Sequence, residues 1–154
     1  MKPDRMISEE EAYRIVRYEN QAYISMIDID HKPYGVTINY AFDEIENKLY
    51  FHCSKVGRKI QALKANPEVS VLIVQNPHIV PIRYTTHYFS SMIEGEISFI
   101  DEEESKREKL GFICDKLCPN ELERRDFVIE KYLKAVSIGC ISISKITGKS
   151  NQDK

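Results

Sequence analysis

The sequence predicts a mainly β fold of the α+β type, in which an antiparallel sheet curls into a barrel with short helices at its periphery. Residues 22–29, near one end of the chain, and residues 136–143, near the other, alternate apolar and polar side chains as half-buried strands do. Between them, residues 101–133 change to helical spacing. Strands at both ends of the chain, with a helical segment inside it, favour a curled antiparallel sheet.

The other elements follow from local patterns. Ser8 and Glu11 form a capping box that begins the first helix. Gly95 marks a bulge or a close approach within a long strand or bent pair. The strand at residues 68–75 is rich in β-branched residues and is expected to be buried on both faces. The predicted helices after the first cover residues 60–66, 101–118 and 121–133, and the predicted strands cover residues 22–29, 34–42, 48–52, 68–75, 84–100 and 136–143.

One domain, residues 1–154, is the expectation for a chain of this length, with residues 148–154 as a loose tail. Hydrophobic residues at 42% and charged residues at 30% are ordinary for a globular protein. The net charge of -2 argues against general nucleic-acid binding, which needs a broad basic surface. The chain shows no apolar run of membrane-spanning length and no apolar core of a signal peptide. We therefore expect a cytoplasmic protein that binds neither nucleic acid nor membrane.

The four cysteines are scattered, and a reducing cytosol would keep them as thiols. Cys114 and Cys118 stand one helical turn apart and could hold zinc together with a histidine. Neither a Cys-x-x-Cys pair nor a second cluster at ligand spacing accompanies them. We expect these thiols to pack within a helix, and we predict no metal site.

A local cluster of cations is the main candidate for a binding site. Lys55, Arg58 and Lys59 lie on or just before the first turn of the short helix predicted at residues 60–66. A cation at this end of the helix dipole is unfavourable by about 0.3–1 kcal/mol. The same end offers free backbone N–H groups, which make an anion site together with Lys and Arg side chains. Two interpretations stay open: a phosphate-binding loop, or three long side chains that extend into water.

His52 stands at the carboxyl end of a strand, directly before these cations. Its imidazole could stack on or donate to a bound ring, or it could be a structural histidine. The other histidines, at residues 31, 78 and 87, lie in turns or polar segments and are expected to be solvated. The sequence motifs of serine hydrolases, zinc proteases and P-loop proteins are absent.

Short motifs follow one another along nearly the whole chain. In order, they are Arg5-Met6, Pro33-Tyr34-Gly35-Val36-Thr37-Ile38-Asn39-Tyr40, Leu49-Tyr50-Phe51-His52-Cys53-Ser54, Gly57-Arg58-Lys59, Asn66-Pro67-Glu68-Val69, Tyr88-Phe89-Ser90-Ser91-Met92-Ile93-Glu94-Gly95 and Ile146-Thr147-Gly148-Lys149. Their order and spacing resemble the Nim-type nitroimidazole-resistance group of the pyridoxamine 5′-phosphate oxidase-like flavin proteins.

This resemblance implies a six-stranded split β-barrel that forms a homodimer and binds FMN in a groove between the two subunits. By position, Arg58 and Lys59 correspond to the basic pair that grips the FMN phosphate, with Gly57 directly before them. The residues placed along the ribityl chain and phosphate are His52, Cys53 and Ser54.

The same resemblance places Thr37 and Asn39, at alternate positions of one strand, against the isoalloxazine ring. Ser90 matches the serine of the family's Tyr-x-Ser pattern and would come from a neighbouring strand. Two departures weaken the match. The strand that contains Thr37 lacks a proline that is often found there, and Cys53 stands where serine or threonine is commoner.

The implied function is that of a flavin-dependent reductase, which passes electrons from a nicotinamide or another donor to a small, oxidised, planar substrate such as a nitroaromatic compound. The sequence contains no separate substrate signature. Two alternatives stay open: a non-catalytic flavin-binding protein, and a haem-handling relative in which His52 ligates iron. Pyridoxamine phosphate oxidation is not expected, because the C-terminal residues that bind the substrate phosphate in that enzyme have no evident counterpart.

Overall fold

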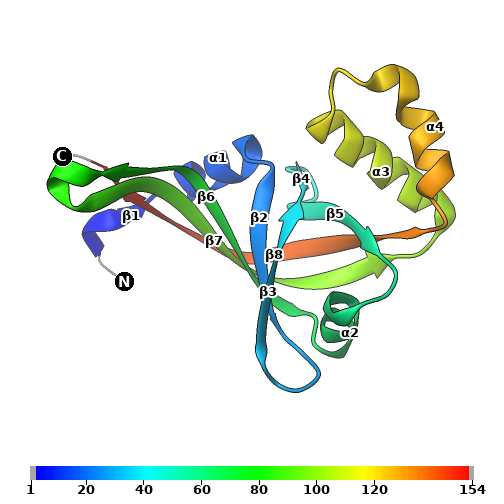
Figure 1. Cartoon of the computed structure of the whole chain (residues 1–154), viewed down its shortest axis with the longest axis horizontal. Coiled ribbons are helices and arrows are strands. Elements are labelled where there is room, and N and C mark those ends of the chain that lie inside the picture. Colours follow the sequence, from blue (N-terminus) through cyan, green and yellow to red (C-terminus); the bar gives the residue numbers. More distant parts are fainter. Residues whose placement is uncertain (1–2, 153–154) are drawn as a thin grey trace.

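The computed structural model describes residues 3–152, which form one eight-stranded antiparallel sheet with four α-helices and two short 3-10 helices (Figure 1). The mainly β, α+β fold class is confirmed. The helices are η1 (Pro3–Arg5), α1 (Glu9–Tyr18), α2 (Arg58–Ala65), η2 (Pro81–Arg83), α3 (Glu103–Leu117) and α4 (Leu122–Tyr132). The strands are β1 (Met6–Ile7), β2 (Gln21–Ile27), β3 (Pro33–Asn39), β4 (Ala41–Asp43), β5 (Lys48–Ser54), β6 (Glu68–Val80), β7 (Thr85–Ile100) and β8 (Val136–Asn151).

The sheet has eight strands rather than the predicted six, because two short strands do not show in the alternation pattern. β1 has two residues, and β4 is the final part of the strand predicted at residues 34–42. That strand breaks at Tyr40, whose backbone N–H donates to the Asn20 carbonyl (3.1 Å) and whose hydroxyl donates to the Val16 carbonyl (2.9 Å). Held by both bonds, Tyr40 redirects the chain, so that β3 pairs with β2 whereas β4 pairs with β5.

The strand order is β3-β2-β6-β7-β8-β5-β4, with β1 paired to β8 outside this path. β3 and β4 are the two ends, and within residues 3–152 no pairing joins them, so the barrel is split rather than closed. The sheet nevertheless curls enough that some Cα atoms of β3 and β5 lie within 8 Å of each other. In Figure 1, α2 lies below this opening and the α3–α4 pair lies to its right.

Most of the residues that were expected to form a loose C-terminal tail belong to β8. Residues 148–151 are not loose but continue β8, where they pair with β7, and Gly148 and Lys149 also pair with β1. A Cβ atom at Gly148 would lie 2.6 Å from Ile7 Cγ1 and 3.0 Å from Ala12 Cβ, so this close approach requires glycine. Residues 153–154 of the predicted tail lie outside the described residues. The irregularity predicted at Gly95 is confirmed, since the register between β7 and β8 shifts between Glu94 and Gly95.

Two apolar cores lie on opposite faces of the sheet. The larger core fills the inside of the curl, with α1 and α2 contributing side chains. The smaller core lies between the outer side of β5 and β8 and the helices α3 and α4. Neighbouring residues of β5 serve the two cores alternately: Leu49 and Phe51 belong to the larger one, and Tyr50 belongs to the smaller one.

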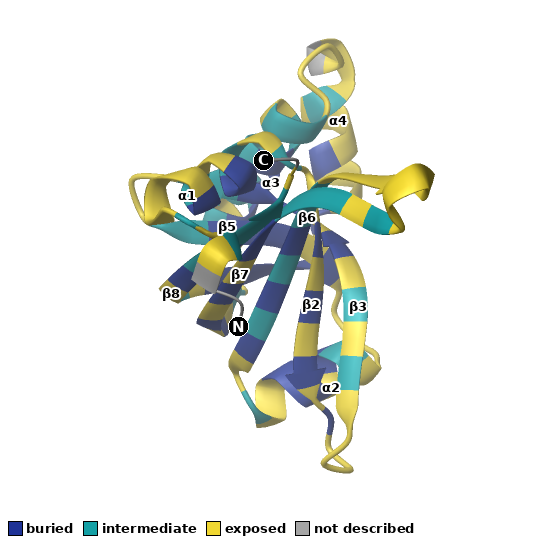
Figure 2. Cartoon of the chain, turned by 90° about the vertical axis from the view of Figure 1, so that its left-hand side faces the viewer, coloured by how far each residue is buried: buried dark blue, intermediate teal, exposed yellow. Residues whose placement is uncertain are grey.

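The outer face of β3, β2, β6 and β7, which points away from the larger core, is only partly buried. A row of paired residues crosses it from Thr37 through Tyr23 and Leu72 to Met92. Tyr23 is 52% exposed and Met92 is 39% exposed. The prediction that β6 is buried on both faces is therefore wrong: buried and less buried residues alternate along its first half (Figure 2), because the described part of the chain covers only the inner face.

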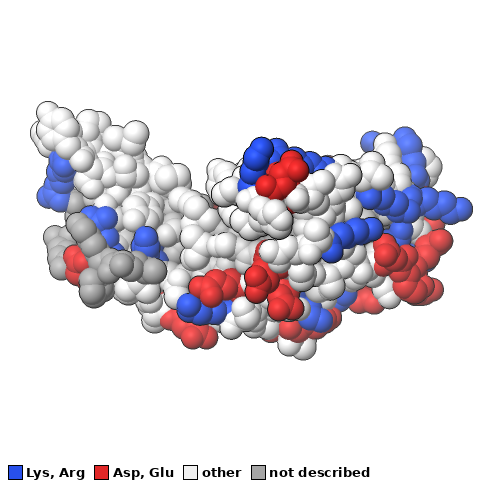
Figure 3. Space-filling model, turned by 90° about the horizontal axis from the view of Figure 1, so that it is seen from below, with Lys and Arg blue, Asp and Glu red and all other residues white. Residues whose placement is uncertain are grey.

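Charged side chains of both signs crowd the α3–α4 end of the molecule, at the right of Figure 3. The opposite end is mostly uncharged in this view and carries the arm, residues 76–88, that is formed by the ends of β6 and β7 and the turn between them. Apolar side chains are exposed on this arm, with Ile82 at 90% and Tyr84 at 98%. Within residues 3–152, no helix combines the length and apolar character that crossing a membrane requires.

Candidate functional site

The split of the sheet places two unpaired strand edges near each other. β3 pairs with β2 on one side only, and residues 51–54 of β5 pair with β8 but lie beyond the end of β4. In the described chain neither edge has a further strand partner, so its backbone groups are open to a ligand or to a second chain. We call the region bounded by β3, residues 51–54 and the start of α2 the seam.

Four of the predicted site residues line the two borders of the seam on its outward side. Thr37 and Asn39 are exposed on β3, on either side of the buried Ile38. His52 and Ser54 are exposed on β5. Because side chains of a strand alternate between its faces, each pair projects away from the larger core. The structure thus gathers residues far apart in sequence at the borders of one opening.

Cys53 differs from its neighbours, because its thiol points into the larger core. The residue is 6% exposed, and burial raises the pKa of its thiol. The prediction that Cys53 lines the cofactor site is therefore corrected for its side chain, since the alternation that exposes His52 and Ser54 turns Cys53 inward. Only the backbone of Cys53 borders the seam.

Unlike the α-helices whose first turn is capped by a side chain, α2 has an uncapped N-terminus. Gly57 is its N-cap, with φ of 121°, a conformation that L-residues rarely adopt, and it has no side chain to cap the first turn. The first turn contains no acidic residue. By contrast, Ser8 caps α1, where its Oγ accepts a hydrogen bond from the backbone N–H of Glu11 (3.2 Å). The free N–H groups of α2 are therefore available to an anion.

Arg58, in this first turn, is held by a carboxylate that the sequence interpretation missed. Its Nη2 and Nε donate to Asp28 Oδ2 at 2.5 Å and 3.2 Å, and its guanidinium lies 4.2 Å from the centre of the Tyr34 ring. Asp28 is 4% exposed, and its Oδ1 accepts from the backbone N–H groups of Asp30 and Lys32. These interactions hold the pKa of Asp28 below its ordinary value. The Arg58 guanidinium has the largest effect, and the backbone donors add to it.

The sequence did contain a signal for Asp28. The residue continues the buried set of the first long strand, two positions after Met26, so it is a carboxylate on the face that alternation assigns to the core. A buried carboxylate needs a cation or several hydrogen-bond donors. Asp28 leaves the Nη1 group of Arg58 available to another acceptor, so the pair orients the guanidinium without using all of its donors.

Asp28 pairs with Arg58 and not with Lys59, the next residue of α2. The ammonium of Lys59 lies 5.4 Å from the centre of the Phe51 ring, and no ion pair of Lys59 occurs within the described residues. Lys55 precedes the helix in an exposed loop that Ser54 supports, because Ser54 Oγ accepts from the backbone N–H of Val56 (3.3 Å). The three cations therefore remain concentrated at the open end of α2.

Ser90 is not brought to the seam of its own chain. It lies on β7, which β2 and β6 separate from β3 and which β8 separates from β5. β7 is therefore not a direct neighbour of either strand that borders the seam. The expectation that Ser90 comes from a neighbouring strand is therefore wrong within one chain, because strand order depends on long-range pairing that local sequence does not show.

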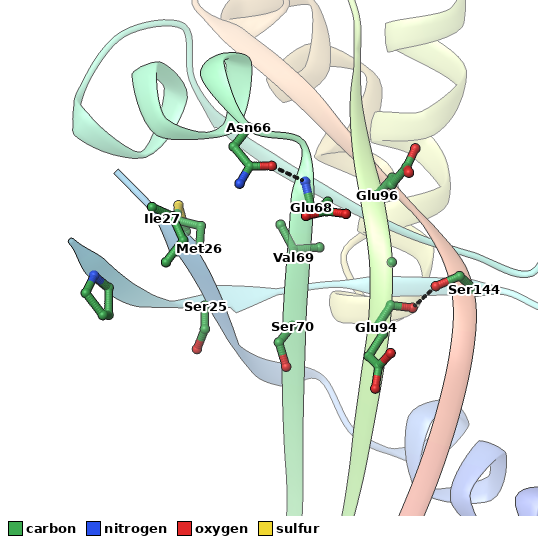
Figure 4. Close-up of a pocket in the computed structure, with 12 residues that line it drawn as sticks. Ser25, Met26, Ile27, Asn66, Glu68, Val69, Ser70, Glu94, Glu96 and Ser144 are labelled. Atoms are coloured by element: carbon green, nitrogen blue, oxygen red, sulfur yellow. Dashed lines mark hydrogen bonds between the residues drawn. The ribbon is translucent and has the colours of Figure 1, made fainter. Parts of the chain in front are cut away.

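Two hollows lie near the site. One, of about 310 Å³, lies between α3, α4 and the start of β8, and His52 forms part of its wall. The other, of about 500 Å³, lies on the outer face beside β2, β6 and β7, where Glu68, Glu94 and Glu96 line it (Figure 4). The second hollow has no Lys or Arg among its lining residues, so it does not suit an anionic cofactor.

Comparison with solved structures shows the same fold in several proteins. A candidate 5-nitroimidazole antibiotic resistance protein from Bacteroides thetaiotaomicron is 21% identical, with coverage of 96% of this chain and 90% of that one and a TM-score of 0.78. The flavocytochrome Anf3 from Azotobacter vinelandii is 21% identical, with coverage of 95% and 68% and a TM-score of 0.80. An FAD-binding protein from Mesorhizobium loti is 20% identical, with coverage of 97% of both chains and a TM-score of 0.64.

At these identities the likeness establishes the fold and nothing more. No significant match was found among curated proteins. A family model described as pyridoxamine 5′-phosphate oxidase matches residues 8–150, which is nearly the whole chain. The protein therefore belongs to the pyridoxamine 5′-phosphate oxidase family, as the order of its motifs predicted.

Proposed function

We propose that the protein binds FMN along the seam and uses it to reduce small, oxidised, planar molecules, including nitroaromatic compounds, as a member of the Nim-type group. The observation that carries this proposal is the open N-terminus of α2, where Gly57 leaves the backbone N–H groups uncapped and Arg58 and Lys59 stand beside them. A phosphate would accept from these donors and offset the repulsion between the cations and the helix dipole. The family and the flavin-binding neighbours support a flavin as the bearer of that phosphate.

The side chains around the seam suit the rest of a flavin. Thr37 offers a hydroxyl and Asn39 an amide, and both can form hydrogen bonds with the polar edge of a planar ring. Ser54 and the backbone of Cys53 lie between this border and the phosphate site. We favour the mononucleotide because the seam offers one cluster of phosphate-binding groups, at α2.

When bound, the flavin supplies the redox chemistry, and the protein supplies orientation, electrostatics and access. Reduction of a nitro group to an amine takes six electrons and six protons and releases two molecules of water. Three nicotinamide donors, each giving a hydride, together with three protons from solvent, complete this balance. Arg58 and Lys59 would hold the phosphate charge, and His52 would stand beside the path to the acceptor.

We further propose a homodimer in which a second copy covers the seam and contributes Ser90. The support is the outer face, where Tyr23 and Met92 remain exposed in a continuous row on the sheet. Exposed apolar surface of this kind marks interaction sites. The strand order, which keeps Ser90 away from the seam of its own chain, fits a contribution from the second copy.

We also propose a cytoplasmic location. All four cysteines are free thiols, and two of them, Cys53 and Cys140, are buried. A reducing compartment keeps such thiols from oxidising. It also contains the nicotinamide donors that the proposed reaction consumes.

The phosphate assignment is tested by FMN titration of Lys59→Ala, with Lys64→Ala as the matched control at the other end of α2. Loss of one charge-assisted hydrogen bond should weaken FMN binding by roughly 1.5–3 kcal/mol in the Lys59 variant, and the control should bind as the wild type does. If Arg58→Ala and Lys59→Ala both leave the affinity for FMN unchanged, the phosphate assignment is wrong.

The reductase assignment is tested by oxidation of NADH in the presence of a nitroaromatic acceptor. We expect three equivalents of NADH to be consumed for each amine formed. Tight FMN binding without turnover of any acceptor or donor would identify a non-catalytic flavin-binding protein instead. Binding of haem in preference to FMN, with a Soret band that changes in His52→Ala, would identify the haem-handling alternative.

A further inference from the structure

The cavity between α3 and α4 is the strongest feature of the molecule without an assigned role. It has a volume of about 310 Å³, at the small end of the range for small-molecule sites. Apolar side chains from both helices form most of its wall, among them Ile113, Leu117 and Val128. His52 and Tyr132 provide its ring-bearing polar groups.

The chemistry of the wall restricts what can bind. None of the residues that line the cavity is Asp, Glu, Lys or Arg. A charged ligand would lose part of its hydration against this wall without gaining an ion pair from it, and that loss is costly. An uncharged ring of one cycle matches both the size and the apolar wall, and the imidazole N–H of His52 can donate a hydrogen bond to an oxygen on it.

The wall of the cavity is held in place by polar contacts. Lys106 is 4% exposed, and its Nζ donates to the carbonyl of Leu133 (2.8 Å) at the end of α4. Arg107 Nε donates to Glu130 Oε1 (2.5 Å), which ties α3 to α4 a second time. These contacts fix the distance between the two helices. The cavity therefore lies between two helices that these contacts join.

His52 connects the cavity to the seam, because it lies on the outward side of β5 and also lines the cavity. Resting on the FMN assignment above, we propose that the α3–α4 cavity binds the electron acceptor as a small, uncharged, single-ring molecule. Oxygen substituents of this molecule lie toward His52. The cavity disfavours acceptors that carry a carboxylate.

Val128→Trp tests this site, because residue 128 is 37% exposed and a larger ring there would fill the cavity. Phe127→Trp is the matched control on the same helix, since Phe127 is 67% exposed and does not line the cavity. The FMN-loaded proteins are reduced with dithionite, and reoxidation is followed with nitrobenzene, 4-nitrobenzoate or dioxygen.

We expect Val128→Trp to slow reoxidation by nitrobenzene at least about tenfold. Reoxidation by dioxygen should not change, and Phe127→Trp should behave as the wild type. The wild type should prefer nitrobenzene to 4-nitrobenzoate. Equal rates with the two nitro compounds, or equal slowing with every acceptor in Val128→Trp, would overturn the assignment.

Binding is measured separately by the methyl NMR signals of Ile113 and Leu117 on addition of nitrobenzene. We expect these signals to shift in the wild type and not in Val128→Trp, while those of Ile15 in the larger core stay in place. This readout needs no bound flavin. Unshifted signals would therefore refute the cavity as a binding site for the acceptor. Shifted signals in a protein that fails to bind FMN would refute the proposed function, and with it the role of the bound ring as an electron acceptor.

Discussion

At the scale of single residues, Asp28 shows how one buried carboxylate organises a cationic loop. Its two carboxylate oxygens have different partners. Oδ1 accepts hydrogen bonds from the backbone of the turn at residues 30–32, and Oδ2 accepts from Arg58. The turn is thereby joined to Arg58, the first residue of α2, which lies thirty positions after Asp28 in the chain. Arg58 is thus positioned by Asp28 and by the Tyr34 ring before any ligand arrives.

Asp28→Asn should lower the affinity for FMN by about tenfold and leave the affinity for riboflavin, which lacks the phosphate, unchanged. The amide keeps an acceptor for the turn but no longer attracts the guanidinium, so Arg58 loses its orientation. Fluorescence titration with both flavins measures the effect, and Asp30→Asn in the same turn is the control. Equal loss for the two flavins would show a collapsed turn, and tighter FMN binding would show that Asp28 competes with the phosphate.

A second residue-scale prediction concerns Gly139, which faces the Phe51 ring across the β5–β8 pair. A Cβ atom there would overlap the ring, and Phe51 is fully buried and cannot move aside. Gly139→Ala should therefore lower the free energy of unfolding by about 1–3 kcal/mol. Gly111→Ala in α3, where a Cβ meets nothing within 4 Å, should raise it by about 0.5–1 kcal/mol. Urea denaturation measures both, and a neutral Gly139→Ala would contradict the packing.

At the scale of elements, Glu46 fastens α3 to the sheet. It lies in the turn between β4 and β5, and its carboxylate accepts from Lys109 of α3 at 2.9 Å, Tyr50 at 2.8 Å and Lys48 at 3.0 Å. These hydrogen bonds lower the pKa of Glu46 to about 2, and the bond from Lys109 has the largest effect. The position of α3, and with it the cavity, thus depends on a contact outside the helix pair.

This contact predicts a pH dependence of stability. The folded pKa of Glu46 lies below the ordinary value of 4.5, so its stabilising contribution is complete above about pH 4.5 and is lost as the pH falls toward 2. At neutral pH, Glu46→Gln should melt a few degrees below the wild type, roughly 2–4 °C. The difference between their melting temperatures should shrink between pH 4.5 and pH 2. A difference that stays constant over this range would contradict the assignment.

Elements with a strong local pattern were predictable from the sequence. Alternation located β2, and helical spacing located α3 and α4 to within a few residues. The parts that were missed depend on distant partners. β1 is a strand because it pairs with the second half of β8, which itself pairs with β7. The two residues of β1 carry no periodicity from which it could be recognised.

The candidate site, like the fold, was predictable from the sequence only in part. The cations beside α2 are visible in the sequence because they contradict the helix dipole. The family motif pointed to Thr37 and Asn39, which lie exposed on β3 at the border of the seam. The inward orientation of Cys53 depends on which face of β5 packs against the larger core. The distance of Ser90 from the seam depends on the strand order. Both are set by the assembled sheet and not by the local sequence.

At the scale of the whole molecule, the open sheet leaves both the seam and the outer face without cover from the described chain. Tyr23→Glu, which places a charge on the outer face, should convert a dimer into a monomer with reduced FMN affinity, because the burial of apolar surface between copies is lost. Tyr18→Glu is the control, since Tyr18 is 72% exposed at the end of α1. Sedimentation equilibrium measures the mass, and a wild-type monomer with tightly bound FMN would contradict the proposed dimer.

The most direct test of the central claim is the absorption spectrum of the purified protein, followed by identification of the molecule that denaturation releases. We predict the two visible bands of an oxidised flavin and the release of FMN, one molecule for each chain. A protein that stays colourless after incubation with FMN and gel filtration, or that shows a Soret band in place of the flavin bands, would contradict it.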